Sequence, residues 1–295
     1  FNRCSMGVQD FQPEVQVAVN RIQPEAITRQ AIAWARALGF TSINIDLMYG
    51  LPFQTRETFA ATLATVLTLQ PDRLAIFNYA HLPQMFKHQR MIQDDWLLAP
   101  EEKLEILKLS IETLTAADYV YIGMDHFARP DNELAHAIEQ GTLYRNFQGY
   151  STHAGLNLIA MGMSSISMLS SLYVQNHKTL GDYYQALDAG ALPILRGVEL
   201  TADDRLRRAV IVELMCNFVL HKAPIEEKYG IDFDTYFADA LSQLHPFAAD
   251  DLIHLEEDKL VVTTAGRLLI RNIVMNFDAY LQKKSGSQPQ FSRTV

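Results

Sequence analysis

The N-terminal part of the chain alternates between two spacings of apolar side chains. In the opening segment FNRCSMGVQDF, apolar residues alternate with polar or small ones from position 4 to position 8, as they do in a half-buried strand. Apolar segments at 43–47, 74–79 and 119–124 predict three further strands. Between these segments apolar residues recur every three or four positions, which predicts amphipathic helices.

Helix boundaries are marked by residues that start or stop helices. Pro24 stands at the start of a helix that Gly39 ends, and Thr55 is placed to cap a second helix. Pro71 closes that second helix and Pro100 begins a third. Repeated strand-then-helix units joined by short loops imply parallel strands with right-handed crossovers. The expected architecture is therefore α/β, either a barrel or a doubly wound sheet.

Candidate site residues are expected at the ends of these strands. The residues concerned are Gln9, Asp46, Ala80 with His81, and Asp125 with His126. In parallel barrels, functional side chains gather at the carboxyl ends of the strands. Four such ends favour an open barrel mouth over a doubly wound sheet. They also predict that Gln9 and Asp46 are neighbours on its wall.

The rest of the chain is less regular and then becomes helical. Residues 81–98 are predicted to form a lid or a loop with short helices, 129–153 a second irregular stretch, and 156–172 a buried strand and helix. After about residue 180, helices are expected at 201–220, 225–229 and 233–244, followed by a hairpin at 252–263 and a final helix at 264–281. This order is winged-helix-like. We therefore expect the remainder of a barrel with lid loops at 1–180 and a mostly helical C-terminal domain at 181–295.

Composition narrows the classes of function. A chain of 295 residues with 48% hydrophobic content can bury a large core, and no apolar run reaches the ~18 residues that cross a bilayer. The net charge of -9 argues against general nucleic-acid binding. Cys4 and Cys216 do not make a disulfide framework, which favours a reducing, cytoplasmic setting. Nothing in the pattern indicates a large exposed apolar seam, so a monomer is expected.

Four motifs carry more specific information. They are GVQDF near the N-terminus, DLMYGLPFQT after the second strand begins, and GMDHFA and RNFQGY farther along. Together they resemble the oxygen-independent coproporphyrinogen III oxidases, a family of radical S-adenosylmethionine (SAM) enzymes, and the last two separate true oxidases from their heme-chaperone paralogues. Phe53 stands where many relatives carry glycine. The resemblance runs along essentially the whole chain and implies a partial (β/α) barrel of the radical SAM type.

The resemblance implies contacts with SAM, with two SAM molecules expected. The implied SAM-binding residues are Gln9, Arg21, Asp46, Ala80 and Ile166, with Phe147 and Gln148 near a second SAM. A guanidinium can hold the methionyl carboxylate, an amide can donate and accept hydrogen bonds, and a carboxylate can accept them from ribose hydroxyls. The pattern alone offers ordinary alternatives: a core strand for Gln9, a solvated charge for Arg21 and core packing for Ile166.

The implied activity is the oxidative decarboxylation of two propionate side chains of coproporphyrinogen III to vinyl groups, which gives protoporphyrinogen IX in heme biosynthesis. A 5′-deoxyadenosyl radical made from SAM starts this reaction, which also needs an electron donor and an electron acceptor. The family holds a [4Fe–4S] cluster with a C-x-x-x-C-x-x-C motif, which the sequence lacks. With no start methionine either, the chain is expected to be the C-terminal portion of a longer polypeptide whose upstream cysteines bind the cluster. Alone, it is expected to be inactive and to bind no cluster.

Other functions stay open. A heme chaperone with the same barrel would bind heme without oxidase activity, and an unrelated barrel hydrolase would use Asp46 and Asp125 as acid and base. DNA binding by the C-terminal domain is disfavoured by charge, and Asp125 with His126 has no further ligand at metal spacing. Because the net charge repels a tetracarboxylate, local cations must hold the propionates. The candidates, each of which also fits a solvated loop, are Lys87, His88, Arg90, Arg129 and Arg145.

Overall fold

The computed structural model describes residues 1–282, which form two compact units, residues 1–136 and residues 137–282. The domain boundary expected near residue 180 stays a prediction, and the end of the expected second domain lies outside the described residues. The helix α5 (Glu133–Glu139) crosses from one unit to the next in the sequence.

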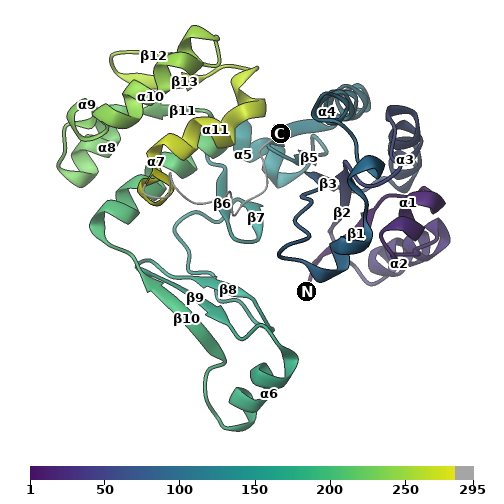
Figure 1. Cartoon of the computed structure of the whole chain (residues 1–295). Coiled ribbons are helices and arrows are strands. Elements are labelled where there is room, and N and C mark those ends of the chain that lie inside the picture. Colours follow the sequence, from purple (N-terminus) through teal and green to yellow (C-terminus); the bar gives the residue numbers. More distant parts are fainter. Residues whose placement is uncertain (283–295) are drawn as a thin grey trace. The chain divides into compact units, whose positions relative to one another are not determined.

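A five-stranded sheet organises the first unit (Figure 1). Its strands are β1 (Arg3–Gln9), β2 (Ser42–Tyr49), β3 (Arg73–Asn78), β4 (Val120–Gly123) and β5 (His126–Ala128), in the order β1-β2-β3-β5-β4. Strands β1, β2 and β3 run parallel as predicted, whereas β5 is antiparallel to both of its neighbours. The expected direct parallel pairing of β4 with β3 is therefore wrong, because β5 lies between these two strands. Gly123 and Met124 have positive φ angles of 142° and 53°, and this backbone reverses the chain into the β4–β5 hairpin.

The predicted helices of the first unit form with the predicted boundaries. They are α2 (Glu25–Ala37), α3 (Arg56–Leu69) and α4 (Pro100–Ala116). A short further helix, α1 (Pro13–Ala18), was not predicted. Pro24 directly precedes α2, and the Thr55 hydroxyl accepts a hydrogen bond from the Thr58 amide at 3.2 Å to cap α3. Gln70 adopts a left-handed conformation with φ of 49° and ends α3 just before Pro71.

The helices of this unit pack against one face of the sheet. Ile43, Ile45 and Leu47 of β2 have no exposed surface and join a core with residues of α2, α3 and α4. Since successive side chains of a strand point to opposite faces, Asn44 and Asp46 lie on the other face. That second face carries polar side chains and is where the candidate site begins.

Residues 81–98 form the loop with short helices that the sequence predicts. The 3₁₀ helices η1 (Lys87–Met91) and η2 (Asp94–Trp96) lie in it. Its start is held by the buried side chain of Gln89, which accepts a hydrogen bond from the Leu82 amide at 2.5 Å and donates one to the Ala80 carbonyl at 3.0 Å. The segment is therefore anchored to the chain that leaves β3.

Phe53 links this segment to the loop after β2. Its backbone is left-handed, with φ of 63°. Glycine adopts such angles without cost, whereas phenylalanine does not. The Phe53 amide donates to the Trp96 carbonyl at 3.0 Å, and the two ring centroids lie 4.9 Å apart. These contacts hold the strained conformation in place.

The second unit contains two antiparallel sheets and a hairpin. The hairpin consists of β6 (Tyr144–Asn146) and β7 (Gly149–Ser151). The first sheet is a long ribbon of β8 (Ile166–Met168), β9 (Leu172–Asn176) and β10 (Ile194–Glu199), and α6 (Leu180–Asp188) lies between β9 and β10 in the sequence (Figure 1). The second sheet consists of β11 (Val219–His221), β12 (Ile253–Leu255) and β13 (Lys259–Val262). The prediction of an irregular stretch at 129–153 is thus wrong, because α5 and the hairpin lie there. The helix expected within 156–172 is also wrong. Gly155 and Gly162 have φ angles of 75° and 102°, which interrupt any helix.

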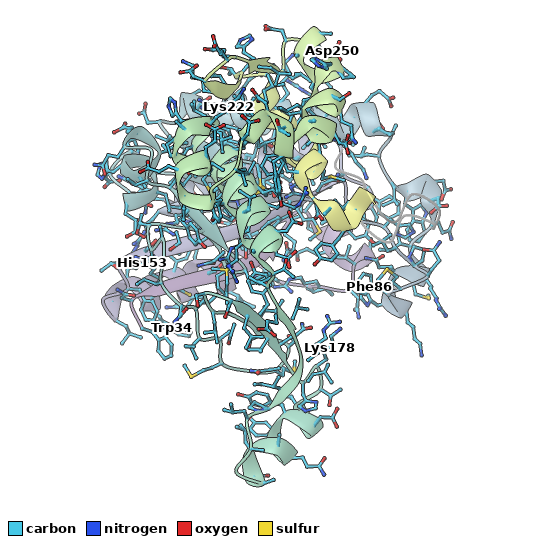
Figure 2. All side chains as sticks on the ribbon, turned by 90° about the vertical axis from the view of Figure 1, so that its left-hand side faces the viewer. Trp34, Phe86, His153, Lys178, Lys222 and Asp250 are labelled. Carbon is cyan, nitrogen blue, oxygen red and sulfur yellow. The ribbon has the colours of Figure 1, made fainter. Side chains whose placement is uncertain are left out.

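The end of the second unit has the predicted winged-helix-like order. The helices are α7 (Ala202–Asn217), α8 (Lys222–Tyr229), α9 (Phe233–Tyr236) and α10 (Ala238–Ala249), and β12 and β13 form the predicted hairpin. Lys222 begins α8 and Asp250 follows α10 (Figure 2). The short strand β11 was not predicted; it pairs with β13 and completes the sheet.

The single final helix expected at 264–281 is instead broken into pieces. They are η3 (Gly266–Leu269), α11 (Ile270–Val274), η4 (Met275–Phe277) and α12 (Ala279–Gln282). The Asn276 side chain donates to the carbonyls of Asn272 and Ile273, at 3.0 Å each, and so competes with the helical backbone bonds. Across residues 1–282, every helix is too short or too polar to cross a membrane.

Candidate functional site

Three of the predicted site residues converge on Gly7 in β1. Gly7 is paired with Asp46 of β2, and a register shift then pairs Gln9 with Leu47. Arg21, in the loop between α1 and α2, donates from Nη2 to the Gly7 carbonyl at 2.5 Å. A Cβ atom on Gly7 would lie 2.8 Å from Gln9 Nε2 and 3.4 Å from Arg21 Nη2. The missing side chain of Gly7 therefore leaves the space in which the amide and the guanidinium meet. The β1–β2 pairing places the backbones of Gln9 and Asp46 close together, and their sharing of one site wall stays a prediction.

Gln9 has two features that are uncommon in a structural residue. Its backbone is left-handed, with φ of 69°, which costs a residue other than glycine about 1 kcal/mol. Its side-chain Oε1 is buried and has no hydrogen-bond partner in the described part of the chain. Buried polar atoms are nearly always paired, so an exception in a strained residue indicates a place for an external donor. The amide is thus suited to accept a hydrogen bond from a ligand.

Asp46 lies in the body of β2 rather than at its end. The prediction of a strand-end position is wrong because β2 continues to Tyr49. The carboxylate is met by two donors, as expected for an acid in an apolar strand: Ser5 Oγ at 3.0 Å and Asn44 Nδ2 at 2.7 Å. A carboxylate accepts up to about four hydrogen bonds, so Asp46 retains capacity for hydroxyl donors of a ligand.

Ala80 lies just beyond the end of β3, as predicted. Its carbonyl is held by Gln89, as described above, and its side chain is half-buried. Next to it, His81 Nδ1 lies 3.2 Å from the Tyr79 hydroxyl, and His81 Nε2 lies 3.3 Å from Asp94 Oδ1. The role of Ala80 as a SAM contact stays a prediction.

The remaining predicted residues belong to the second unit. Phe147 and Gln148 occupy the turn of the β6–β7 hairpin, and the Phe147 ring meets Tyr173 of β9 edge-on at a centroid distance of 5.0 Å. Phe147 is 49% exposed, so the hairpin presents it rather than buries it. Ile166 begins β8 and is paired with Gln175 of β9. These positions fit both ligand contact and ordinary packing.

Arg145 is a cation of this hairpin with incomplete pairing. Its guanidinium carbon lies 4.8 Å from the centre of the Tyr150 ring, and its Nη1 is buried with no hydrogen-bond partner among residues 1–282. Arg129, another candidate, forms an exposed ion pair with Asp131 at 3.3 Å. Of these two, Arg145 is the cation with a buried donor left for an anion.

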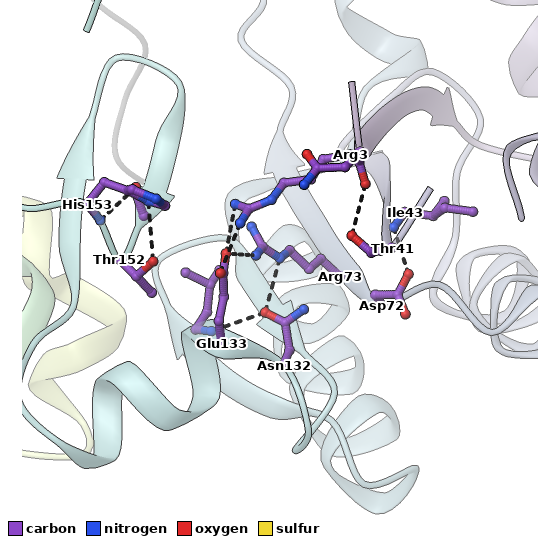
Figure 3. A network of polar contacts seen from close by, with 12 residues as sticks. Arg3, Thr41, Ile43, Asp72, Arg73, Asn132, Glu133, Thr152 and His153 are labelled. Carbon is purple, nitrogen blue, oxygen red and sulfur yellow. Dashed lines mark hydrogen bonds and ion pairs between the residues drawn. The ribbon is translucent and has the colours of Figure 1, made fainter. Parts of the chain in front are cut away.

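At the amino-terminal ends of β1 and β3, the charged side chains neutralise one another (Figure 3). Glu133 lies 2.7 Å from both Arg3 and Arg73, and Arg73 also donates to Asn132 at 3.1 Å. Burial lowers the pKa of Arg73, while the hydrogen bond and the charge of Glu133 oppose that effect. Asp72 accepts from the Ile43 amide at 2.7 Å. These charges are occupied in holding the chain together, unlike Arg21 beside Gly7.

The two thiols do not form a metal site. Cys216 is buried in α7, and burial raises its pKa to about 12, whereas Cys4 is half-buried in β1. No group of three or more metal-ligating side chains occurs within residues 1–282. An iron–sulfur cluster held by three thiolates needs more cysteines than the two of this sequence.

One buried residue at the candidate site is absent from the predicted site residues. Asp10 follows Gln9 directly, is 1% exposed, and accepts three hydrogen bonds, from the Gln12 amide, Gln54 and Thr62. The signal for it was a carboxylate placed at the end of an apolar strand. Its partners lie far along the chain, so their pairing was not visible in the sequence.

Comparisons with known proteins agree with this arrangement. The family described as HemN C-terminal domain matches residues 200–269. Oxygen-independent coproporphyrinogen III oxidase from Escherichia coli (strain K12) is 53% identical over 295 residues, which are 100% of this chain and 64% of the relative. The protein of the same name from Thermostichus vulcanus is 52% identical over 296 residues, covering 100% of this chain and 90% of that relative. The chain belongs to the oxygen-independent coproporphyrinogen III oxidase family.

A solved member of this family supports the fold. Coproporphyrinogen III oxidase (HemN) from Escherichia coli, described as a radical SAM enzyme, matches with a TM-score of 0.90 at 53% sequence identity, over 95% of this chain and 64% of that chain. The sheet of the first unit is open, with β1 and β4 at its edges. The predicted fold, a partial radical SAM barrel followed by a mostly helical C-terminal region, is therefore confirmed. The chain spans 64% of the Escherichia coli relative and 64% of the solved Escherichia coli chain.

Proposed function

We propose that this chain is the SAM-binding and substrate-binding portion of an oxygen-independent coproporphyrinogen III oxidase. The reaction removes two propionate carboxyl groups of coproporphyrinogen III as carbon dioxide and leaves vinyl groups, giving protoporphyrinogen IX. The convergence of Gln9, Arg21 and Asp46 on Gly7, with a buried unpaired acceptor among them, carries the proposal. The reaction is inferred from membership of the oxidase family.

The residues around Gly7 fit SAM chemically. Arg21 can hold the methionyl carboxylate, because a guanidinium pairs with a carboxylate through two parallel hydrogen bonds. The unpaired Oε1 of Gln9 can accept from the SAM ammonium, and Asp46 can accept from the ribose hydroxyls. When bound and reductively cleaved, SAM supplies the 5′-deoxyadenosyl radical that abstracts hydrogen from a propionate. The side chains named here bind and orient; none of them transfers a proton.

Further contacts are proposed at positions that the fold leaves available. Ala80 and Ile166 would contact the first SAM, and Phe147 and Gln148 a second one. Phe147 is suited to this role because its ring is half-exposed yet fixed by Tyr173. An aromatic face of this kind can stack on an adenine.

The [4Fe–4S] cluster does not fit the residues of this chain. We propose that its three thiolates come from cysteines outside the 295 residues, and that these residues alone bind no cluster and have no oxidase activity. An electron donor and an electron acceptor complete the reaction. The working form is proposed to be a cytoplasmic monomer.

Arg145 is the proposed partner of a substrate propionate. Its Nη1 donor is buried without a hydrogen-bond partner, and an unpaired buried donor is costly, so an incoming carboxylate would relieve that cost. Arg145→Leu is expected to raise the KM for coproporphyrinogen III about tenfold while leaving SAM affinity unchanged, which is the loss of roughly one charge-assisted hydrogen bond. Arg196→Leu removes the same charge from β10, where Arg196 bonds Gln175, and serves as the control. Equal KM values for the two variants would contradict the role.

The SAM assignment is tested by binding rather than by turnover alone. The intact protein, reconstituted anaerobically, is dialysed against radiolabelled SAM. Arg21→Lys is expected to weaken binding about tenfold, because lysine cannot make the bidentate contact. Arg29→Lys, an exposed member of an ion pair with Glu25 on α2, is the matched control. Unchanged affinity in Arg21→Lys would refute the assignment, and heme transfer without conversion of coproporphyrinogen III would favour the chaperone alternative.

A further inference from the structure

A buried carboxylate ties the end of β1 to two distant parts of the first unit. Asp10 Oδ1 accepts from the Gln12 amide at 2.8 Å and from the Thr62 hydroxyl of α3 at 2.6 Å. Asp10 Oδ2 accepts from Gln54 Nε2 at 2.5 Å. The exposed fractions of Asp10, Gln54 and Thr62 are 1%, 2% and 0%, so water does not compete for these bonds. The residue immediately after Gln9 is thus fixed from three directions.

Gln54 extends this connection into the loop after β2. Its Nε2 also donates to the Met48 carbonyl at 2.9 Å, and its Oε1 accepts from the Leu51 amide at 2.9 Å. The GVQDF and DLMYGLPFQT motifs are therefore joined through one side-chain pair, Asp10 with Gln54. Each motif also contains one residue of the candidate SAM site.

A second buried amide fixes the loop that carries Arg21. Gln16 Nε2 donates to the carbonyls of Asp10 and Gln23, at 2.9 Å each, and its Oε1 accepts from the Gln23 amide at 2.9 Å. The Gln16 backbone carbonyl accepts from the Arg21 amide at 2.8 Å. Gln16 has only 6% of its surface exposed, and it connects Asp10, at the end of β1, to Arg21 and to Gln23.

We infer that Asp10 and Gln16 are positioning residues that set the orientation of Gln9 and Arg21 for SAM. The left-handed backbone of Gln9 is unfavourable for a residue with a side chain, so it persists only where its neighbours over-determine it. Asp10 supplies that constraint on the following residue. Gln16 does the same for Arg21, whose long side chain would otherwise sample many rotamers. The inference rests on the proposed role of Gln9 and Arg21 in binding SAM.

Calorimetric titration of SAM into the intact protein tests this inference. Asp10→Asn keeps the shape of the side chain but points an amide donor at Gln54 Nε2. It is expected to weaken SAM binding about tenfold, which corresponds to the loss of one aligned hydrogen bond. Gln16→Met, of similar length but without polar groups, is expected to do the same through Arg21. If Asp10→Asn fails to fold, the Gln16 variant carries the test.

Double variants separate positioning from simple loss of stability. If Asp10 acts through Gln9, Asp10→Asn with Gln9→Ala will bind SAM no more weakly than Gln9→Ala alone, and Gln16→Met with Arg21→Ala will behave likewise. Val66→Ala, which cuts into the core of the same unit on α3, destabilises the unit without touching these bonds and is expected to leave SAM affinity unchanged.

The outcomes distinguish the inference from the proposed function beneath it. If Gln9→Ala and Arg21→Ala bind SAM as well as the unaltered protein, the SAM site itself is refuted. If those two variants weaken binding but Asp10→Asn and Gln16→Met behave like Val66→Ala, only the positioning role is overturned. Additive losses in the double variants would overturn it as well.

Discussion

Replacing Thr62 by valine should lower the free energy of unfolding of the first unit by about 2 kcal/mol. Valine has nearly the shape of threonine, so the substitution removes a hydroxyl without opening a cavity. The lost bond is the 2.6 Å contact from Thr62 Oγ1 to Asp10 Oδ1, in a site with no exposed surface at Thr62. Hydrogen bonds to charged groups contribute about 1.5–3 kcal/mol, and the burial of Asp10 and Thr62 keeps solvent from replacing the lost donor. The loss should therefore exceed that of an ordinary surface substitution several-fold.

The chain provides its own probe for this measurement. Both of its tryptophans, Trp34 and Trp96, lie in the first unit, so urea unfolding followed by tryptophan fluorescence reports on that unit. With an m-value of about 1.5 kcal/mol/M, a loss of about 2 kcal/mol lowers the urea midpoint by about 1.3 M. Thr65→Val on the same helix is the control, since the Thr65 hydroxyl only bonds the Ala61 carbonyl one turn earlier. Equal midpoints for the two variants would refute the view that the Asp10 contacts are a main stabiliser of this unit.

Three further predictions concern other parts of the chain. Gly266→Ala should destabilise the second unit by about 3 kcal/mol or more, because the new Cβ would lie 1.9 Å from the Leu252 carbonyl oxygen; a thermal melt equal to that of the unaltered protein would contradict it. Burial lowers the pKa of Lys103 from its ordinary 10.5, because the charged form is disfavoured in the folded state. The resulting loss of folding stability is full at neutral pH and disappears as the pH rises through the folded pKa towards 10.5. Lys103→Met should accordingly raise the urea midpoint at pH 7 and have less effect at pH 10, and an effect independent of pH would count against this reasoning. Iodoacetamide at pH 8 should label Cys4 but not Cys216, because a pKa of about 12 leaves only about one thiolate in ten thousand; labelling of both thiols in the native protein, seen by mass spectrometry, would show that Cys216 is not held as described.

Local signals in the sequence were enough for most of the elements. Thr55 and Pro100 mark helix starts through chemistry that acts within one turn, and both helices begin where expected. The strand β5 was missed because it has three residues and exists only through pairing with β3 and β4. Elements of that length have no periodicity to detect, so pairing partners decide them.

The candidate site divides in the same way. Gln9 and Asp46 stood out as polar groups expected at the ends of apolar strands, and their assignment to a SAM site came from the resemblance of the GVQDF and DLMYGLPFQT motifs. The position of Asp46 within β2 depended on where that strand stops. Asp10 was missed as a site residue because its partners Gln54 and Thr62 are 44 and 52 residues away. Such contacts are set by packing of α3 on the sheet, which the spacing of polar residues does not reveal.

The left-handed backbone of Phe53 has a consequence for the family as a whole. A relative with glycine at this position would relax the backbone but would lose the ring that rests on Trp96, keeping only the amide-to-carbonyl bond between the two segments. Residues 81–98 should then exchange their amide hydrogens faster in that relative than in this protein. The residue at this one position would thereby set how readily residues 81–98 open, because glycine relaxes the backbone and phenylalanine adds an aromatic contact.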